Sequence, residues 1–419
     1  MARPGRRCGT RRSRVVRHRC RSMTRRPPEG FDDDLDPHDG TTEGHRGHDP
    51  PPAADPGVRT VRDDSAATPT VHEHITDAIR TPSLVRLAPN TVLIRFETLK
   101  VYAALGAVRH LLDTGVLRPG QTVVDSSSGI YALALAMACH RYGLRCHIVA
   151  STTVDDTLRA QLEILGVTVD QMPPSHDLDL DQNRRVARVR ELLARQPDLH
   201  WMRQYHDPVH HRGYAELADL LRSALPGEPL TVVGSVGTGA STGGLVRALR
   251  RHDPLVRLVG VQPFGSVTFG SERFTDPDAI IAGIGSAIHF DNVHHELYDR
   301  VHWMDFQHAM AATIDLMRTH AVFAGLSTGA AHLAAQWEAG RDPVRTHVVI
   351  GADTGHRYTA RVFARHREAL APALLAPAEI TSLEELAPPW AAIDWARRSY
   401  EPAVPAQQRP QDCRKDLVP

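Results

Sequence analysis

Short apolar runs alternate with segments of helical periodicity through most of the chain, and this alternation limits the folds open to it. The apolar runs are Thr91–Phe96, Thr122–Val124, Cys146–Ala150, Val167–Val169, Leu230–Gly234, Val256–Val261 and Thr346–Ile350. Each run is short enough to form one strand, and the segments between the runs repeat apolar residues at helical spacing. The pattern predicts an α/β fold of parallel sheets with helices on both faces, which binds ligands at the carboxyl ends of its strands.

The length of the chain allows more than one such sheet. At 419 residues it is long enough for about two domains, so we expect two open twisted sheets. A short helix at Val71–Ile79 and a strand at Thr81–Leu87 are expected before the first apolar run. The main helices are predicted at Val101–Leu112, Ile130–Tyr142, Asp155–Leu165, Asn183–Ala194, Gly213–Ser223, Gly243–Arg251, Gln307–Thr319, Thr328–Ala339 and Tyr358–His366.

Both ends of the chain differ in composition from its middle. Residues 1–26 contain many arginines and no acidic residue, and residues 29–64 are rich in Asp, His, Pro and Gly with almost no large apolar side chain. Such segments bury too little surface to offset the entropy of ordering. Residues 1–70 are therefore predicted to be a disordered tail, and the sequence does not indicate its function. We expect a folded unit over 71–370, then a helix-containing appendage and a loose tail over 371–419.

Charge and composition argue against several classes of protein. The formal net charge is zero, which predicts no nucleic-acid partner for the folded part, and no apolar run reaches the length of a membrane span. Of five cysteines only Cys139 and Cys146 lie within 71–370, which suits a reduced cytoplasm. The 25 histidines show no ligand spacing, so no metal site is expected.

Lysine is almost absent from the chain. Of 49 basic residues only Lys100 and Lys415 are lysines, and Lys415 lies in the predicted polar tail. An ammonium group that leaves water can lose its proton and condense with an aldehyde, whereas a guanidinium group stays protonated. Chance survival of one lysine is the simple alternative, but the segments around Lys100 favour a reactive lysine.

Two loops near the predicted strand ends are suited to binding anions. Ser126-Ser127-Ser128-Gly129 precedes a predicted helix, whose free N–H groups and dipole favour an anion such as a carboxylate, although a serine-rich helix cap is the plainer interpretation. Gly237-Thr238-Gly239-Ala240-Ser241 also leads into a helix, and its small residues would let the backbone surround a phosphate. No P-loop lysine follows and the loop comes late in the chain, which argues against a nucleoside triphosphatase or a dinucleotide fold. A reactive lysine, a carboxylate site and a phosphate loop together suggest pyridoxal phosphate.

This set of motifs resembles the cysteine synthase family, the fold type II pyridoxal phosphate enzymes, over about residues 75–363. Ordered matches carry the resemblance, and they are Thr81-Pro82, Leu84-Val85-Arg86-Leu87, Lys100, Gly115-Val116-Leu117, Ser127-Ser128-Gly129, Gln204-Tyr205-His206-Asp207-Pro208, Gly237–Ser241, Gly283-Ile284-Gly285, Gly325–Ala330, Asp353-Thr354-Gly355 and Arg357-Tyr358. The resemblance implies a tryptophan synthase β-like catalytic unit over 71–370 with a smaller subdomain at about 105–215. It also implies a homodimer that acts on a small amino acid.

The resemblance implies a role for each matching residue. Lys100 would bind the cofactor and act as general base, and the residues Gly237, Thr238, Gly239, Ala240 and Ser241 would bind its phosphate. The substrate would be held by Ser127, Ser128, Gly129, Tyr131 and Gln204. The implied reaction is β-replacement on an O-activated serine. The leaving group and the nucleophile stay open, as does β-elimination to a keto acid.

The chain departs from the family pattern at three places. Residues that usually precede the lysine are missing, because Glu97-Thr98-Leu99 runs directly into Lys100. Ile130 replaces the asparagine that bonds the cofactor's ring hydroxyl, and either Asp353 or Thr354 would face the pyridine nitrogen. These changes predict a specialised substrate. A catalytically silent binding protein is the alternative from another class, and the retained lysine argues against it.

Overall fold

The structure is a computed structural model of the chain, and it describes residues 70–151, 154–173, 178–276, 278 and 283–400. The tail predicted over 1–70 lies, apart from Thr70, outside the described residues, and so does the end of the chain from residue 401. In the described part no helix is long and apolar enough to cross a membrane. No group of three or more His, Cys, Asp or Glu side chains in that part is placed to hold a metal ion.

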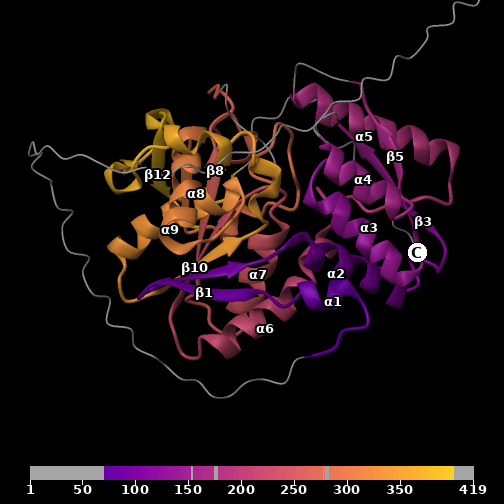
Figure 1. The fold of residues 1–419 in the computed structure, drawn as a ribbon, viewed down its shortest axis with the longest axis horizontal. Helices are drawn as coiled ribbons and strands as arrows, with labels where there is room; N and C mark the ends of the chain where they lie inside the picture. The colour runs from indigo at the N-terminus through magenta and orange to yellow at the C-terminus, as the bar shows by residue number, and fades with distance from the viewer. Residues whose placement is uncertain (1–69, 152–153, 174–177, 277, 279–282, 401–419) are drawn as a thin grey trace, which may run out of the picture. The chain divides into compact units, whose positions relative to one another are not determined.

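The strands form two sheets (Figure 1). The larger sheet has the order β1-β2-β10-β7-β8-β9-β12-β11 and the smaller sheet β5-β4-β3-β6. The strands of the larger sheet are β1 (Ser83–Ala88), β2 (Thr91–Arg95), β7 (Leu230–Ser235), β8 (Arg257–Pro263), β9 (Arg300–Met304), β10 (Thr346–Gly351), β11 (Ala378–Ile380) and β12 (Trp390–Asp394). Those of the smaller sheet are β3 (Thr122–Ser126), β4 (Arg145–Ala150), β5 (Thr168–Gln171) and β6 (His200–Trp201).

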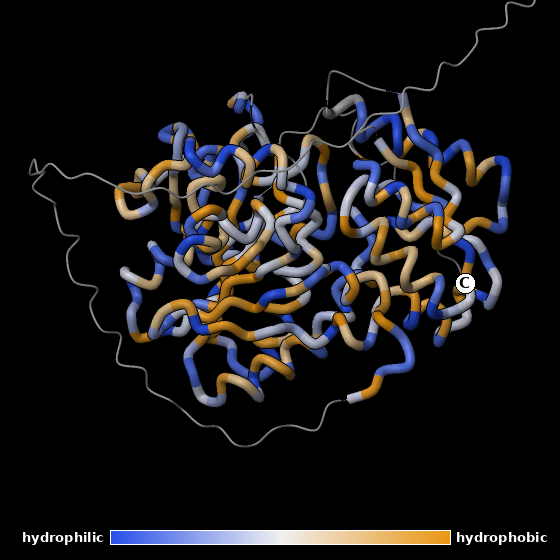
Figure 2. The backbone as a smooth tube through the Cα atoms, in the orientation of Figure 1, coloured by the Kyte–Doolittle hydropathy of each residue, from blue (hydrophilic) through white to orange (hydrophobic). Residues whose placement is uncertain are grey.

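Helices cover both faces of the larger sheet, as the alternation of residues along its strands requires. Val232 and Val348 pack on one face with α2 and α7, whereas their neighbours Val233 and Val349 pack on the other with α8 and α9. Figure 2 shows hydrophobic stretches along the strands of this sheet. The α-helices are α1 (Ile75–Ile79), α2 (Lys100–Asp113), α3 (Ile130–Tyr142), α4 (Asp156–Ile164), α5 (Leu178–Arg195), α6 (Tyr214–Ala224), α7 (Ala240–Arg250), α8 (Phe306–His320) and α9 (Leu326–Arg341).

The fold class is the predicted α/β class, but the larger sheet is mixed and not wholly parallel. β1 pairs with β2 antiparallel because only the two residues Pro89 and Asn90 separate them, too few for a parallel crossover. β12 pairs with β9 antiparallel at the other side of the sheet. Strands β6, β9, β11 and β12 were not among the predicted strands, because they are short or carry charged residues.

The helix predicted at Tyr358–His366 is wrong. Short 3₁₀ helices occupy 355–358 and 363–368 instead, and Arg365 leaves helical geometry with φ −97° and ψ 15°. Some local backbone hydrogen bonds remain, such as Val362 N–H to Tyr358 O at 2.8 Å, and contacts with other parts of the fold hold the segment. Phe363 packs on Phe323 with ring centroids 4.5 Å apart, and the carbonyl of His366 accepts a hydrogen bond from Arg318.

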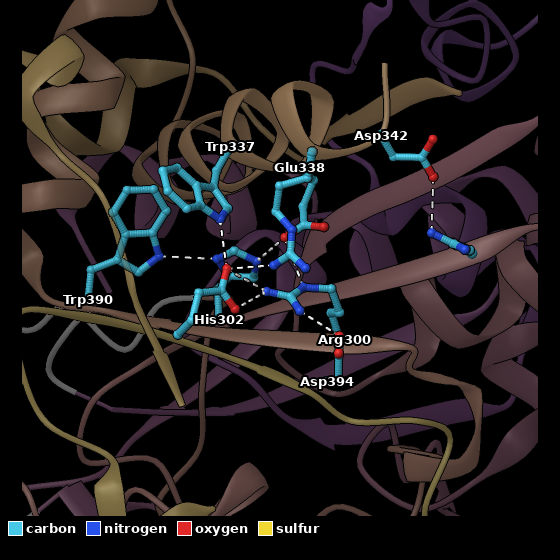
Figure 3. A network of polar contacts seen from close by, with 10 residues as sticks. Arg300, His302, Trp337, Glu338, Asp342, Trp390 and Asp394 are labelled. Atoms are coloured by element: carbon cyan, nitrogen blue, oxygen red, sulfur yellow. Dashed lines mark hydrogen bonds and ion pairs between the residues drawn. The ribbon is translucent and has the colours of Figure 1, made fainter. Parts of the chain in front are cut away.

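An ionic network centred on the buried pair of Arg300 and Glu338 attaches the last two strands to the sheet (Figure 3). Arg300 on β9 donates through Nε to Glu338 on α9 at 2.9 Å and through Nη2 to Glu379 on β11 at 2.7 Å. It also bonds Asp394 on β12. One arginine therefore holds carboxylates from three elements that are distant in sequence.

A histidine completes this network. Trp390 Nε1 lies 3.1 Å from His302 Nδ1, and His302 Nε2 lies 3.0 Å from Glu338 Oε1. The indole can only donate, so His302 accepts at Nδ1 and carries its proton at Nε2 toward the carboxylate. Burial lowers the pKa of His302, which favours this neutral tautomer.

We expect Arg300→Met to lower the free energy of unfolding by about 3–5 kcal/mol, because Glu338 would keep a buried charge without its cation. Arg257→Met is the matched control: Arg257 is 54% exposed and, within the described residues, pairs only with Asp342, so its loss should cost less than about 1 kcal/mol. Urea denaturation of both variants measures the difference. Equal losses would show that the buried network is no more stabilising than a surface ion pair.

Candidate active site

A cavity of about 440 Å³ lies at the carboxyl ends of strands from both sheets. It contains most of the residues that the sequence singled out. Those that line it are Lys100, Ser127, Ser128, Gly129, Ile130, Tyr131, Gln204, Gly237, Thr238, Ser241 and Asp353. Gly239, Ala240 and Thr354 do not line it.

Lys100 is the first residue of α2 and follows β2 after a connection of four residues. That connection is tied to the end of β10, because Phe96 N–H donates to Gly351 O at 3.0 Å and Leu99 N–H to Ala352 O at 2.8 Å. The residues missing before Lys100 thus leave a short, hydrogen-bonded link. Lys100 Nζ donates to Thr238 Oγ1 at 3.1 Å, and burial lowers its pKa to about 8. A substantial fraction of the amine is therefore neutral near physiological pH.

The loop between β7 and α7 presents free donors to the cavity. The backbone N–H groups from Gly237 to Ser241 donate no hydrogen bond to the described part of the chain. Gly239 has φ +78°, and a Cβ there would lie 2.5 Å from the carbonyl oxygen of Asn292. Gly239 and Ala240 therefore shape the loop from behind while Gly237, Thr238 and Ser241 face the cavity, an arrangement that fits a phosphate group.

A second set of free donors stands at the start of α3. Gly129 is the N-cap and no side chain caps this helix, so the N–H groups of Ile130 and Tyr131 have no acceptor in the described part of the chain. The loop is fixed from outside: Ser127 N–H donates to Val149 O at 3.1 Å, and Ser128 Oγ accepts from Ser151 N–H at 2.7 Å. The loop can bind a carboxylate through backbone N–H groups and the Ser127 hydroxyl.

Gln204 and Tyr131 enter the cavity with their polar atoms already oriented. Gln204 Nε2 donates to Ser126 O at 2.7 Å, which orients the amide and leaves Oε1 and the second Nε2 hydrogen for a ligand. Tyr131 Oη lies 2.8 Å from His210 Nε2, and His210 Nδ1 lies 3.1 Å from Asp207 O. His210 must donate to that carbonyl through Nδ1, so Tyr131 donates its proton to Nε2. Ile130 adds an apolar surface beside it.

Asp353 faces the cavity and Thr354 does not. Asp353 Oδ1 is buried with no hydrogen-bond partner in the described part of the chain, and burial raises the pKa of this carboxyl to about 7 against the opposing effect of Arg357. Thr354 Oγ1 instead lies 2.8 Å from His356 Nδ1 at the surface. A Cβ on Gly325 would collide with Asp353 Oδ1, so Gly325 makes room for the carboxyl.

Several residues that line the cavity were not predicted individually from the sequence, and three of them bear on its chemistry. Ser327 lies in the first turn of α9 and lines the cavity beside Asp353. Arg357, half-buried, donates to Ser128 O at 3.3 Å and lies near Asp155 at 3.6 Å. Ser327 and Arg357 stand in segments that the sequence did single out. Arg185 gave no signal, because an arginine four residues after an aspartate is also typical of an exposed helix face.

Arg185 is buried on α5 and points to the same cavity. Its Nε lies 3.1 Å from Asp181 Oδ2, its Nη1 donates to Ser126 Oγ at 2.8 Å, and Tyr205 Oη lies 3.4 Å away. Its Nη2 donates no hydrogen bond to any acceptor in the described residues. Asp181 also lines the cavity and neutralises this guanidinium, so what Arg185 adds is a fixed cationic donor at Nη2, separate from the N-terminus of α3.

The residues of the cavity fit pyridoxal phosphate. A lysine with a lowered pKa can bind an aldehyde, the loop after β7 offers N–H groups to a phosphate, and Asp353 has a buried oxygen that lacks a partner. The two open anion sites both follow Lys100 in the sequence, and they stand at the starts of two separate helices, α3 and α7. The donor set thus matches a phosphorylated aldehyde together with an amino acid.

Known proteins resemble this chain in sequence and in fold. The family model described as "pyridoxal-phosphate dependent enzyme" matches residues 69–351. N-(2-amino-2-carboxyethyl)-L-glutamate synthase of Cupriavidus metallidurans is 30% identical over 258 residues, which cover 60% of this chain and 74% of that protein. The O-acetylserine dependent cystathionine β-synthase of Bacillus subtilis is 23% identical over 256 residues, covering 61% of this chain and 81% of that protein.

Solved structures give the same architecture. O-ureido-L-serine synthase superposes with a TM-score of 0.62 at 26% identity, covering 70% of this chain and 96% of that one. O-acetylserine sulfhydrylase isoform 3 of Entamoeba histolytica has a TM-score of 0.62 at 21% identity, covering 72% and 93%, and supports the fold alone. The chain belongs to the pyridoxal-phosphate dependent enzymes, with the fold type II architecture of the cysteine synthase family and pyridoxal 5'-phosphate as its cofactor.

Proposed function

We propose that the enzyme catalyses β-replacement on an O-activated serine, and that the leaving group or the incoming nucleophile carries a second negative charge. The observation that carries the proposal is the buried Arg185 in the cavity, in addition to the N–H groups at the start of α3. An amino acid with only its own carboxylate would need one anion site. A buried guanidinium with a free Nη2 supports a second anionic group.

The names of two similar proteins support this reaction class. The product named for the Cupriavidus metallidurans protein carries a 2-amino-2-carboxyethyl group on glutamate, and that of the solved synthase is an O-substituted serine. Both names describe products with a new bond at the β-carbon of a serine skeleton. An amine of an acidic amino acid is therefore our proposed nucleophile, and β-elimination to a keto acid is the competing outcome.

We assign the chain's own residues as follows. Gly237, Thr238, Gly239, Ala240 and Ser241 would hold the cofactor phosphate, Asp353 and Ser327 would face the ring nitrogen, and Ile130 would lie beside the ring hydroxyl. When bound, pyridoxal phosphate withdraws electrons from the α-carbon of the substrate. With a pKa near 7, Asp353 could hold a proton between itself and the nitrogen, which would strengthen that withdrawal.

The remaining residues would bind the substrate and move its proton. Ser127, Ser128, Gly129 and the following N–H groups would hold the α-carboxylate, while Tyr131 narrows the cavity. Lys100 Nζ would take the proton from the α-carbon as general base and return it after replacement, held in place by Thr238. Gln204 would contribute its acceptor oxygen and the second hydrogen of Nε2, because only one Nε2 hydrogen is bonded to Ser126 O. It can therefore bind an N–H group or a carboxylate oxygen of the substrate.

The oligomeric state and compartment stay predictions. We propose a cytoplasmic homodimer. Cys139 and Cys146 are buried and free, which is compatible with a reducing compartment. Light scattering after size-exclusion chromatography measures the mass directly.

Lys100 should attach the cofactor with a pH dependence set by its lowered pKa. With a pKa of about 8, the neutral amine rises from about one tenth at pH 7 to about nine tenths at pH 9. The rate at which the apo-protein binds pyridoxal phosphate covalently should rise through that window, as followed by visible absorption. Borohydride reduction and peptide mapping should place the adduct on Lys100, and Lys100→Arg should form none. A midpoint above pH 10, or an adduct only on Lys415, would contradict the assignment.

Gly239→Ala should abolish cofactor retention, because the new Cβ would meet the carbonyl of Asn292 and push the loop away from the phosphate. Gly227→Ala is the matched control, since Gly227 has a similar φ of +73° but open space around it. Both variants carry the strain of a left-handed residue, on the order of 1 kcal/mol, and only Gly239→Ala adds the collision. Pyridoxal phosphate is measured after gel filtration. If both variants retained pyridoxal phosphate equally, the loop could not be the one that binds its phosphate.

Substrate assays test the reaction and the role of Arg185. The wild type is assayed with O-acetylserine and O-phosphoserine, each with sulfide, glycine and glutamate as nucleophiles. Arg185→Met should raise the KM of the substrate with the extra negative charge, O-phosphoserine or glutamate, about tenfold or more. The KM of the uncharged counterpart, O-acetylserine or glycine, should change little. Arg184→Met, an exposed neighbour on the same helix, is the control. Efficient cysteine synthesis from O-acetylserine and sulfide, insensitive to Arg185, would refute the specialised function. Keto acid as the main product would favour β-elimination.

A further inference from the structure

We propose that Asp125 is the positioning residue that holds together the two loops on which the amino-acid substrate binds. It does not line the cavity itself. The inference rests on the proposed function, because it takes the start of α3 and Gln204 as the substrate site. It adds a residue that neither the sequence motifs nor the family resemblance singled out.

The Asp125 carboxylate joins three segments of the smaller sheet. Asp125 stands near the end of β3 and is 1% exposed. Its Oδ1 accepts from Ser126 N–H at 2.8 Å and from Trp201 Nε1 on β6 at 3.2 Å, and its Oδ2 accepts from Gln204 N–H at 3.0 Å. One side chain therefore connects the start of the carboxylate loop with the segment that carries Gln204.

Gln204 is held on every side except the one that faces the cavity. Its N–H goes to Asp125, its carbonyl accepts from Asn292 Nδ2 at 2.9 Å, and its Nε2 donates to Ser126 O at 2.7 Å. Asn292 in turn lies directly behind Gly239 of the phosphate loop. The position of the free Gln204 oxygen is thus fixed against both loops of the site, and Asp125 supplies the bond that sets its distance from the carboxylate loop.

Only a carboxylate satisfies these three donors. Both of its oxygens accept, whereas an asparagine would turn an NH₂ group toward one of the N–H groups. A buried carboxylate is costly without such partners, and burial raises the pKa of Asp125 to about 7 even though the three hydrogen bonds and Arg185 oppose the rise. A side chain needed for packing alone would not require that charge.

The test compares Asp125→Asn with Trp201→Phe in the protein loaded with pyridoxal phosphate. Trp201→Phe removes one donor to Asp125 but keeps the bond to Gln204, so it controls for a general loss of packing. The Kd of an amino-acid substrate is read from the visible spectrum of the bound cofactor, and kcat and KM are measured alongside. Hydrogen–deuterium exchange of the peptide around residues 201–207 reports the Gln204 amide without any turnover.

We expect Asp125→Asn to weaken substrate binding roughly 10- to 100-fold, with faster exchange around Gln204 and unchanged pyridoxal phosphate content. Trp201→Phe should stay within about threefold of the wild type. If Asp125→Asn does not fold, Asp125→Ser, which leaves space for water, takes its place with the same expectations.

Unchanged Kd and exchange in a folded Asp125 variant would overturn the inference and leave the proposed function standing. Equal effects of both variants, or a fall in kcat with KM unchanged, would overturn it as well, because a general structural role would explain them. A wild type whose spectrum responds to no amino acid would overturn the proposed function and the inference together.

Discussion

The junction of β2, β10 and α2 is the constraint on which the site depends. Leu99 N–H bonds Ala352 O at the end of β10, and Thr98 forms a bridge with Asp353. Because β2 and β10 are parallel neighbours, their carboxyl ends meet, and the four-residue link leaves Lys100 no freedom to move away from Asp353. The backbone of Lys100 and that of Asp353, which line the same cavity, are placed by main-chain hydrogen bonds, which side-chain variation does not easily disturb.

Burial of ionisable groups gives this cavity its chemical character. Burial lowers the pKa of Lys100 to about 8 and raises the pKa values of Asp125 and Asp353 to about 7. Each group is destabilised in its charged form, so each can gain or lose a proton near neutral pH. The three groups differ in their partners: Asp125 accepts three hydrogen bonds, whereas Asp353 Oδ1 has no partner in the described part of the chain. The buried Arg300, by contrast, is paired with three carboxylates.

The larger sheet supports the site from a distance. Its strands β7 and β10 lead into the proposed phosphate loop and Asp353, and β9 and β12 extend the sheet on the far side through the Arg300 network. Asn292 packs against Gly239 of that loop and donates to the carbonyl of Gln204, which belongs to the segment that follows the smaller sheet. The proposed cofactor and substrate loops thus contact each other through a residue that is distant from both in the sequence.

The sequence by itself determined the α/β class and most strands and helices of the alternating region, and it singled out Lys100 and the two glycine- and serine-rich loops that the fold brings to one cavity. These follow from local periodicity and from residue types that few other roles require. Tertiary structure alone decided that Asp353 and not Thr354 faces the cavity, that Arg185 is buried there, and that β11 and β12 complete the sheet. Asp353 and Thr354 are neighbours in one loop, and the local sequence does not indicate which of them points into the cavity. An arginine four residues after an aspartate has the same local sequence pattern whether its helix face is exposed or lines a cavity. Such choices depend on contacts between distant segments, which local sequence patterns do not encode.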